Sequence, residues 1–431
     1  MNRRHVSTDI PNVQATQYLA GALKVADAIE RLRIDGAEGD VAWTFLNSHP
    51  TTRRSYLSPM TNSLYSGMGG LAVFYMSLYR VSGQTEHLVR ADQIVDSMAR
   101  SREHFDSDMA VSAYFGLASY LYVLVNHQQV TGRDIHAATI DELLLKLEDF
   151  PQQGDEFDFL NGWCGTVTLL VNLYQLQPRQ RLIPLIERYA AAIRAELVKE
   201  DGRFLRKASV TPLLTGFSHG ISGVLQALAK VYEVTKDTSL IALTIDLLED
   251  ENRQKGQGGW LDLREPSIPS HMTKWCHGDA GILISRLQLM HALKDVFDAE
   301  HLAMVEGDIR WCESNIWRHG LGSGYSLCHG DFGNLLCLLA LYRSTGNNLG
   351  IERSLQELSG VAESLFNEDF MGQDSVPVLG MMLGLAGVGQ ALLCAVNPTV
   401  PDVLTLTFMQ SNPATVAQDQ PGAVSPAEPL R

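Results

Sequence analysis

Cysteine is scarce in this chain, with six among its 431 residues. So few thiols in so long a chain do not look like a disulfide framework, and such cysteines are more often metal-bound, catalytic or buried. Basic residues are also in deficit, because 34 lysines and arginines stand against 49 aspartates and glutamates, for a formal net charge of −15. Nucleic-acid surfaces and binders of anionic membranes need clustered basic residues, so both classes are disfavoured.

Long apolar runs are missing as well. The start, MNRRHVSTDIPNVQATQYL, contains no apolar stretch of signal-peptide length, and no run approaches the length that spans a bilayer. We therefore expect a soluble, cytoplasmic protein with no nucleic-acid partner and no membrane insertion. What the sequence does contain is material for a sizeable core, since 45% of its residues are hydrophobic and 19% are charged.

One motif recurs along the chain: Gly-x-x-Gly followed by a strongly apolar stretch. Six copies are clear, and a seventh, degenerate copy, VSAYFGLASYLYVLV, places Ala118 where the second glycine would stand. Consecutive copies are 47 to 58 residues apart, which is room for two helices. The second positions of the seven copies are Gly70, Ala118, Gly165, Gly223, Gly281, Gly333 and Gly387.

The stretches after the glycines and the stretches between the copies differ in pattern. Residues 224–231 are apolar on nearly all sides, which is typical of a buried helix, whereas residues 86–100 are amphipathic at helical spacing. This alternation predicts an inner and an outer helical layer. An open solenoid would need polar capping repeats, but the last copy, VLGMMLGLAGVGQALL, is as apolar as the central ones. We therefore predict an all-α fold, a closed α/α toroid of seven helix pairs.

The predicted domain organisation has three parts. Residues 1–60 are expected to form an N-terminal helical extension packed on the toroid, and residues 61–409 the toroid itself. Residues 410–431, rich in Pro, Ala, Gln and Ser, are expected to be a disordered tail. The glycines allow tight turns and close helix starts, so all seven loops before the inner helices should collect at one end of the toroid.

Chemically capable side chains are concentrated in four of these loops. Alone, each has an ordinary explanation: a buried thiol, a hydrogen-bonded imidazole or a helix-capping carboxylate. At one phase of the repeat, in adjacent loops, they indicate a metal site, and zinc suits a mixed set of thiolates and imidazoles. Four ligands would make a closed structural site and three an open catalytic one, and the spacing does not decide between them. The residues are Asp158 in FDFLNGWCG, His219 in GFSHGISG, Cys276 and His277 in WCHGDAG, and Cys328 and His329 in LCHGDFG.

The segments GFSHGISG, WCHGDAG and LCHGDFGN, with LYSGMGG and DFLNGWCG before them, resemble the lanthionine synthetase C-like family. The resemblance covers roughly residues 60–395 and is closest to the cyclase domain of class II bifunctional lanthipeptide synthetases. It implies an α/α toroid of seven repeats with one zinc ion per chain. Cys276, Cys328 and His329 would hold the zinc, with the fourth position open to a substrate thiol, and His277 would be an active-site neighbour.

The resemblance also implies roles for the remaining residues. His219 matches the active-site histidine of the family, and Asp158 matches its aspartate. An arginine that some members carry four residues before the first cysteine is replaced here by Met272, and Arg264 and Lys274 are the candidates to substitute for it.

The reaction that the resemblance implies is a thiol addition. A cysteine thiolate adds to dehydroalanine or dehydrobutyrine and forms a lanthionine or methyllanthionine ring in a peptide. We hypothesise that His219 protonates the resulting enolate, since an imidazole titrates near neutral pH, and that Asp158 orients it or shuttles protons. The implied partners are a dehydrated precursor peptide and a dehydratase, either separate or fused.

Three alternatives remain open at this point. The same site could add glutathione or another small thiol to dehydroamino acids in proteins. The toroid could instead be a non-catalytic, zinc-containing scaffold or peptide receptor. Glycoside hydrolysis needs two carboxylates across a cleft, for which the loops offer Asp158 and, in the HGD segments, Asp279 and Asp331.

Overall fold

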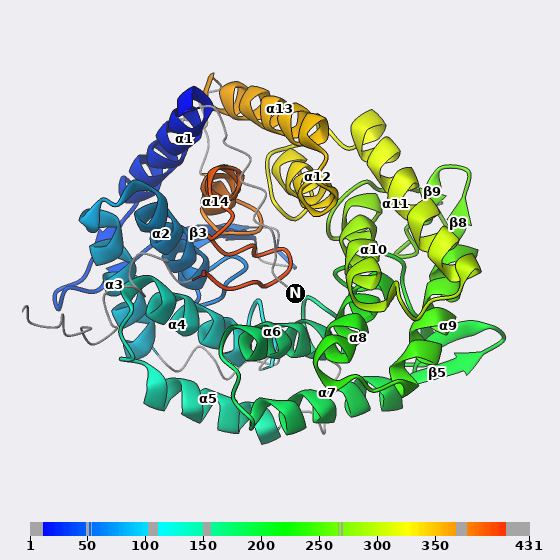
Figure 1. The fold of residues 1–431 in the computed structure, drawn as a ribbon. Coiled ribbons are helices and arrows are strands. Elements are labelled where there is room, and N and C mark those ends of the chain that lie inside the picture. The colour runs from blue at the N-terminus through cyan, green and yellow to red at the C-terminus, as the bar shows by residue number, and fades with distance from the viewer. Residues whose placement is uncertain are drawn as a thin grey trace, which may run out of the picture.

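The structure is a computed structural model that describes residues 12–48, 51–52, 54–101, 111–149, 157–265, 267–268, 270–367 and 377–410. Within these residues, fourteen helices form two concentric rings (Figure 1). The predicted all-α toroid of helix pairs is thereby confirmed. Of the expected C-terminal tail, all residues after Gln410 lie outside the described residues.

Seven helices form the inner ring. Each begins directly after a glycine of the repeat, and the residues of its first turns, Trp163 of α6 excepted, are buried on all sides, as the apolar stretches predicted. The inner helices are α2 (Met68–Ser82), α4 (Leu117–Thr131), α6 (Trp163–Leu176), α8 (Ile221–Thr235), α10 (Asp279–Leu293), α12 (Asp331–Thr345) and α14 (Leu385–Val396).

The outer ring is formed by amphipathic helices. The first helix of the chain, α1, packs against α14 and lies between α13 and α3 (Figure 1), so the outer layer closes through the start of the chain. The Tyr18 hydroxyl joins α1 to α13 by donating to the carbonyl oxygen of Leu355 at 2.5 Å. The outer helices are α1 (Asn12–Glu30), α3 (Thr85–Arg100), α5 (Ala137–Asp149), α7 (Leu182–Glu196), α9 (Ser239–Arg253), α11 (Ala299–His319) and α13 (Asn348–Asn367).

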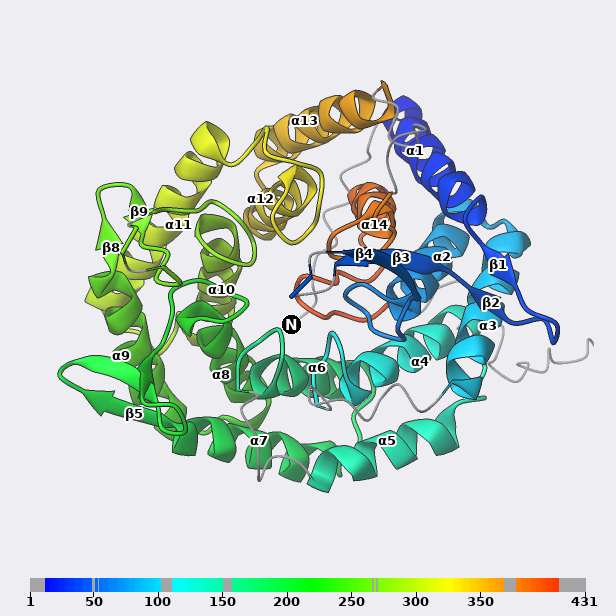
Figure 2. The same ribbon diagram turned by 180° about the vertical axis from the view of Figure 1, so that it is seen from behind.

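Among the described residues, short antiparallel strands occur in three of the connections between outer and inner helices. Figure 2 shows the ring from behind, with the β3–β4 hairpin in front of it. The strands are β1 (Ile34–Asp35) paired with β2 (Val41–Ala42), β3 (Thr44–Ser48) with β4 (Ser55–Pro59), β6 (Arg203–Arg206) between β5 (Leu197–Glu200) and β7 (Thr211–Pro212), and β8 (Lys255–Gly256) with β9 (Gly259–Trp260).

A closed circle of hydrogen bonds joins the seven loops that precede the inner helices. Each loop contributes one residue to the circle, and in six of the seven loops the backbone N–H of this residue donates to the carbonyl oxygen of the equivalent residue in the next loop, at 2.9–3.1 Å. The remaining link runs through the Ser112 hydroxyl, which accepts from the N–H of Tyr114 at 3.0 Å and donates to Leu160 at 2.7 Å. The prediction that all seven loops meet at one end is thus confirmed. The members, each two residues before the glycine that caps an inner helix, are Tyr65, Tyr114, Leu160, Ser218, Cys276, Cys328 and Met382.

The second glycine of each copy is required by close packing. A Cβ on Gly281 would lie 2.1 Å from the carbonyl oxygen of Trp275, and Gly165 and Gly333 are equally confined. The expected alignment of the degenerate copy is wrong by one residue. Helix α4 begins after Gly116, so Ser119 rather than Ala118 takes the second position, and its hydroxyl accepts from the N–H of Leu64 at 3.2 Å.

Residues 397–410 turn back into the centre of the ring, where Figure 1 shows the red segment. Their backbone is held by inner-ring side chains, since the Tyr122 hydroxyl donates to Thr407 at 2.7 Å and the Asn172 amide donates to Leu406 at 2.9 Å. Apart from the exposed Pro398, the apolar side chains of this segment are buried. We call residues 397–410 the central plug. No helix of the described part of the chain combines the length and the apolar character that crossing a membrane requires.

Candidate metal and active site

The residues of the site occupy the same few positions of the repeat, counted back from the glycine that caps each inner helix. The position three residues before the capping glycine is fully buried in every loop, for example at Phe217 and Trp275. The next position belongs to the hydrogen-bonded circle and carries cysteine in two adjacent loops. The position after that carries histidine in three consecutive loops, at His219, His277 and His329.

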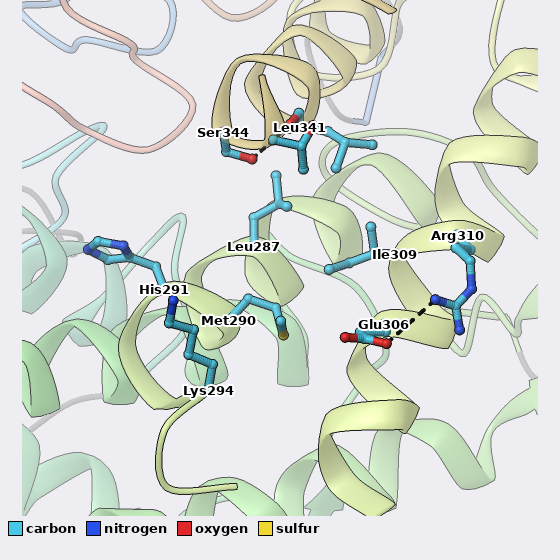
Figure 3. A pocket seen from close by; sticks show the side chains of 10 residues that line it. Leu287, Met290, His291, Lys294, Glu306, Ile309, Arg310, Leu341 and Ser344 are labelled. Carbon is cyan, nitrogen blue, oxygen red and sulfur yellow. Dashed lines mark hydrogen bonds and ion pairs between the residues drawn. The ribbon is translucent and has the colours of Figure 1, made fainter. Parts of the chain in front are cut away.

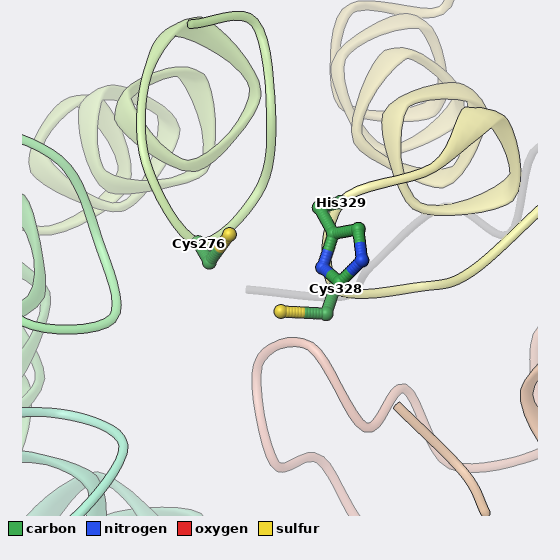
Figure 4. A group of neighbouring side chains, drawn as sticks. All are labelled: Cys276, Cys328 and His329. Carbon is green, nitrogen blue, oxygen red and sulfur yellow. The ribbon is translucent and has the colours of Figure 1, made fainter. Parts of the chain in front are cut away.

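Cys276, Cys328 and His329 lie together between two adjacent loops. Their candidate ligand atoms, two sulfurs and an imidazole nitrogen, all lie within 4.8 Å of one another (Figure 4). The circle sets this proximity, because the N–H of Cys276 donates to the carbonyl oxygen of Cys328 at 3.1 Å. Two thiols and one imidazole at this separation are a donor set that suits a transition metal, so the group could bind a metal ion.

The two thiols differ in how readily they lose a proton. A hydrogen bond from Cys328 lowers the pKa of Cys276, while the same bond, together with burial, raises the pKa of Cys328. Cys276 is therefore the thiolate of the pair and Cys328 the thiol. A cysteine binds a metal as the thiolate, so a bound cation would displace the proton of Cys328.

His219 and Asp158 form a pair in the neighbouring loops. His219 Nδ1 lies 2.8 Å from Asp158 Oδ2, and the other carboxylate oxygen accepts from the N–H of Asn161 at 2.6 Å. Burial alone would lower the pKa of His219, but the hydrogen bond and the negative charge of Asp158 outweigh it, and the net pKa is raised. Because Nδ1 is engaged, the proton that His219 could give to a substrate is the one on Nε2.

His277 lies beside this pair and is not part of the metal-ligand group found among the described residues. Its ring centroid is 5.7 Å from that of His219. Burial lowers the pKa of His277, so its imidazole is neutral at neutral pH. The backbone explains the contrast with His329, because Gly278 after His277 has φ +109° whereas Gly330 after His329 has φ −120°. The two CHGD segments therefore direct their histidines differently, with His277 buried and His329 exposed.

Arg264, one of the two candidates to substitute for an arginine at position 272, lies beside Met272. Its Nη2 is 3.3 Å from Met272 Sδ. Its guanidinium donates two hydrogen bonds to the Asp262 carboxylate, from Nε at 2.9 Å and from Nη2 at 2.6 Å. The hydrogen bond with Asp262 raises the pKa of Arg264, and negative charge on Cys276 acts in the same direction. Lys274 instead donates to the Ser323 hydroxyl.

Tyr65 is a site residue that sequence reasoning missed. Its hydroxyl donates to Cys328 Sγ at 3.2 Å. A signal was present, because Tyr65 stands two residues before Gly67, at the repeat position that carries cysteine in the loops of Cys276 and Cys328.

Glu251 of α9 is a second missed residue, and it holds the loop that carries His219. Its carboxylate accepts from the N–H of Gly216 at 3.0 Å and from the N–H of Ser222 at 3.1 Å, on either side of His219. Arg286 Nη1 lies 2.9 Å from the carboxylate, and both side chains are fully buried. Nothing in an amphipathic outer helix marks this glutamate in the sequence.

The aspartates of the HGD segments bind neighbouring structure. Asp279 accepts from the Asn315 amide at 2.6 Å, and Asp331 accepts from the N–H groups of Gly322 and Ser323 at 2.8 and 3.2 Å. Both aspartates are buried. In the described part of the chain, neither is thus available to pair with Asp158 across a cleft, as glycoside hydrolysis would need.

Two cavities differ in their position relative to the metal-ligand group of Cys276, Cys328 and His329. A cavity of about 340 Å³ has His329 in its wall, together with apolar residues that include Leu365, Val378 and Leu383. A cavity of about 440 Å³ lies between α10, α11 and α12, with Leu287 and Met290 of α10 in its wall (Figure 3). These two residues are near the C-terminal end of α10, whereas Cys276 precedes its N-terminus, so the second cavity is separate from the metal-ligand group.

The fold and these residues define an α/α toroid with a candidate thiol–imidazole metal site at one end. The family model described as lanthionine synthetase C-like protein matches residues 58–407. Because this match spans most of the chain, the protein belongs to that family.

Individual relatives add detail. The chain is 26% identical over 299 residues to the Danio rerio protein named glutathione S-transferase LANCL1, covering 65% of this chain and 70% of the relative. It is 28% identical over 148 residues to the Lactococcus lactis subsp. lactis protein named lacticin 481/lactococcin biosynthesis protein LcnDR2, covering 34% of this chain. That match spans 16% of the length of the Lactococcus protein. The structure of nisin cyclase aligns with a TM-score of 0.61 at 17% identity, covering 87% of this chain and 93% of that chain, which shows a shared fold.

Proposed function

We propose that this protein is a peptide cyclase that adds cysteine thiolates to dehydroalanine or dehydrobutyrine and so forms lanthionine or methyllanthionine rings. One observation carries the proposal: Cys276, Cys328 and His329 have ligand atoms within 4.8 Å of one another, at the end of the toroid that also holds the His219–Asp158 pair. Membership of the family, and the likeness to proteins named for nisin cyclisation and lacticin 481 biosynthesis, support it.

The metal that we propose is one Zn²⁺ per chain, held by Cys276, Cys328 and His329. Two sulfurs and one nitrogen fit the ligand preferences of zinc and leave one tetrahedral position for a substrate thiol. When bound, the ion would keep the substrate cysteine deprotonated at neutral pH, where a free thiol is mostly protonated.

The chain's own residues would complete the addition. The new bond joins the substrate sulfur to Cβ of the dehydroamino acid, and the electron pair of the C=C bond moves towards Cα and its carbonyl. We propose that His219 donates the proton on Nε2 to Cα, and that Asp158 fixes the tautomer and orientation of the imidazole. His277, neutral and beside His219, would border the bound peptide.

The substrate that we propose is a dehydrated precursor peptide. The cavity of about 340 Å³ next to His329 offers an apolar wall for a side chain near the reacting cysteine. A dehydratase, separate or fused, must supply the dehydroamino acids. We propose that residues 61–409, together with α1 in the outer ring, form the catalytic domain.

A second candidate function is the addition of glutathione to dehydroamino acids. One observation favours it: the relative named as a glutathione S-transferase aligns with 65% of this chain. The two functions use the same residues and differ in the thiol that reaches the metal.

One experiment tests both candidates. The zinc-loaded protein is incubated with a peptide that contains one dehydroalanine and one cysteine, with and without glutathione, and products are identified by mass spectrometry after thiol alkylation. Cyclisation leaves the peptide mass unchanged and removes its alkylatable thiol. We expect this product in both mixtures. A glutathione adduct as the main product would favour the second function, and unchanged peptide in both mixtures would refute the first.

A matched pair of variants controls the experiment. Cys276→Ala should lose zinc and ring formation while remaining folded, because it removes one proposed ligand. Cys312→Ala removes a buried thiol of α11 and should retain both. Global unfolding of Cys276→Ala would indicate a structural metal and a non-catalytic scaffold.

A further inference from the structure

The two candidate zinc thiols have unequal surroundings. Cys328 Sγ accepts a hydrogen bond from the Tyr65 hydroxyl at 3.2 Å. Among the described residues, the side-chain hydrogen bonds of Cys276 Sγ come from within the metal-ligand group, from Cys328 and His329. Within the described part of the chain, Cys328 Sγ thus has a phenol donor from outside the metal-ligand group, and Cys276 Sγ has none.

Tyr65 is held firmly in the direction of Cys328. Its N–H donates to Tyr114 at 3.1 Å, and its carbonyl oxygen accepts from the N–H of Met382 at 2.9 Å. Its ring lies against Phe115, with centroids 5.0 Å apart. Met382 also accepts from the N–H of Cys328 at 2.9 Å, so a single residue of the circle separates the backbones of Tyr65 and Cys328. The backbone hydrogen bonds of the loop circle and the packing of the ring thus fix the Tyr65 side chain in the position from which it donates to Cys328 Sγ.

A phenol donor changes the chemistry of the sulfur that it contacts. An O–H hydrogen bond to a thiolate is charge-assisted and withdraws electron density from the sulfur. In the proposed reaction the substrate sulfur must be more nucleophilic than the protein sulfurs. The electrophilic Cβ of the dehydroamino acid has to approach the substrate sulfur while two protein sulfurs lie close by.

We propose that Tyr65 is a positioning residue that keeps Cys328 in its role as a metal ligand and lowers the nucleophilicity of its sulfur. The substrate thiolate, rather than Cys328, then adds to the dehydroamino acid. The reaction that Tyr65 suppresses would form a bond between Cys328 Sγ and Cβ, with a proton delivered to Cα, and would leave the peptide covalently attached to the protein. This inference rests on the proposed function.

The test compares Tyr65→Phe with the wild type and with Tyr79→Phe. Tyr79 lies in the C-terminal part of α2, eleven residues after its first residue, and it controls for the loss of one hydroxyl. Each protein is loaded with Co²⁺, and the sulfur-to-metal charge-transfer band is recorded. Each zinc-loaded protein is then incubated with a dehydroalanine peptide that lacks cysteine, and covalent attachment to Cys328 is measured by intact-mass and peptide-mapping mass spectrometry.

We expect the band of Tyr65→Phe to move to lower energy, because a sulfur without the phenol donor is richer in electrons. We also expect attachment of the peptide to Cys328 to become about tenfold faster, in line with the strength of a hydrogen bond to a charged group. Tyr79→Phe should match the wild type in both measurements. Phe115→Leu keeps the phenol but removes its packing partner, so it should shift the band and the attachment rate in the same direction by smaller amounts. This variant replaces Tyr65→Phe in the test if Tyr65→Phe does not fold.

Two results would overturn the inference. An unchanged band and an unchanged attachment rate in Tyr65→Phe would reduce Tyr65 to a packing residue, while wild-type ring formation would leave the proposed function intact. Failure of the wild type to bind metal, or to cyclise a peptide that contains cysteine, would overturn the proposed function and this inference together. The wild-type measurements therefore separate the two failures.

Discussion

Asp158 and His219 are 61 residues apart in the chain and meet at 2.8 Å. The hydrogen bond to Asp158 and the negative charge of that carboxylate keep the pKa of His219 raised, since burial acts in the opposite direction. The proposed role of His219 is that of an acid, so the rate should fall as the pH rises through its pKa. The carboxylate thus sets the pH range in which the histidine can donate.

Asp158→Asn is expected to move the alkaline limb of the pH–rate profile to lower pH. The amide retains an acceptor but removes the negative charge, so the effect of burial is less opposed and the pKa of His219 falls. The measurement is kcat/KM for thioether formation against pH. Asp96→Asn, at an exposed position in α3, is the charge-matched control and should leave the limb in place. An alkaline limb that does not move in Asp158→Asn would show that His219 is not the acid.

At the residue scale, the sequence predicted the residues whose chemistry is unusual for their repeat position. Two cysteines and three histidines at matching phases are conspicuous in loops that otherwise carry packing residues. The signal at Tyr65, its position two residues before Gly67, was weaker, because a tyrosine there is also explained as a packing residue. Its contact with Cys328 also exists only once the ring has closed and Met382 stands between them.

At the scale of single elements, the start of each inner helix determines where the site residues lie. Helix α10 can approach its own loop only because Gly281 lacks a side chain. A Cβ there would meet the carbonyl oxygen of Trp275 at 2.1 Å and the Cβ of Phe217 at 2.5 Å. Trp275 directly precedes Cys276, so any displacement of this loop moves a candidate metal ligand.

Gly281→Ala is expected to lower the free energy of unfolding by about 3 kcal/mol or more, as overpacking against backbone does, and to weaken metal binding. The matched control is Gly360→Ala in α13, where an added Cβ meets nothing within 4 Å. That substitution should stabilise the protein by about 0.5–1 kcal/mol through helix propensity. Denaturant unfolding and metal titration measure both effects, and equal stability of the two variants would contradict the packing explanation.

Elements were predictable where their pattern is local. The inner and outer helices follow from apolar periodicity, and the capping glycines fix where the inner helices begin. The one-residue error at Ala118 arose because the second copy has Ser119 in place of its glycine. The short strands were not predicted, because pairs such as Ile34–Asp35 with Val41–Ala42 are too short to show an alternating pattern.

At the scale of the whole molecule, two segments from the chain ends complete the ring. Helix α1 fills the outer position beside α14, and the central plug occupies the middle of the toroid (Figure 1). The contacts are very distant in sequence: Tyr18 and Leu355 are 337 residues apart, and Tyr122 and Thr407 are 285 apart. The repeats predicted a closed toroid, but no local pattern shows which segment closes it or fills it.

Removing the central plug should destabilise the whole toroid. A chain that ends at Val396 loses the buried side chains of Val403, Leu404, Leu406 and Met409, each of which contributes about 1.5–3 kcal/mol when buried. We expect it to melt far below a chain that ends at Gln410, or to aggregate, because the apolar lining of the ring is exposed. Differential scanning calorimetry of the two chains gives the comparison, and equal melting temperatures would show that the plug contributes nothing to the fold.

The central claim is that Cys276, Cys328 and His329 hold a zinc ion with one position open to the substrate thiol. X-ray absorption at the zinc edge tests it directly, with spectra of the zinc-loaded protein recorded before and after addition of a dehydrated peptide that contains cysteine. We predict two sulfur ligands and one imidazole from the protein before addition, and a third sulfur afterwards. Two sulfurs and two imidazoles, unchanged by the peptide, would contradict the claim, because His277 would then close the site.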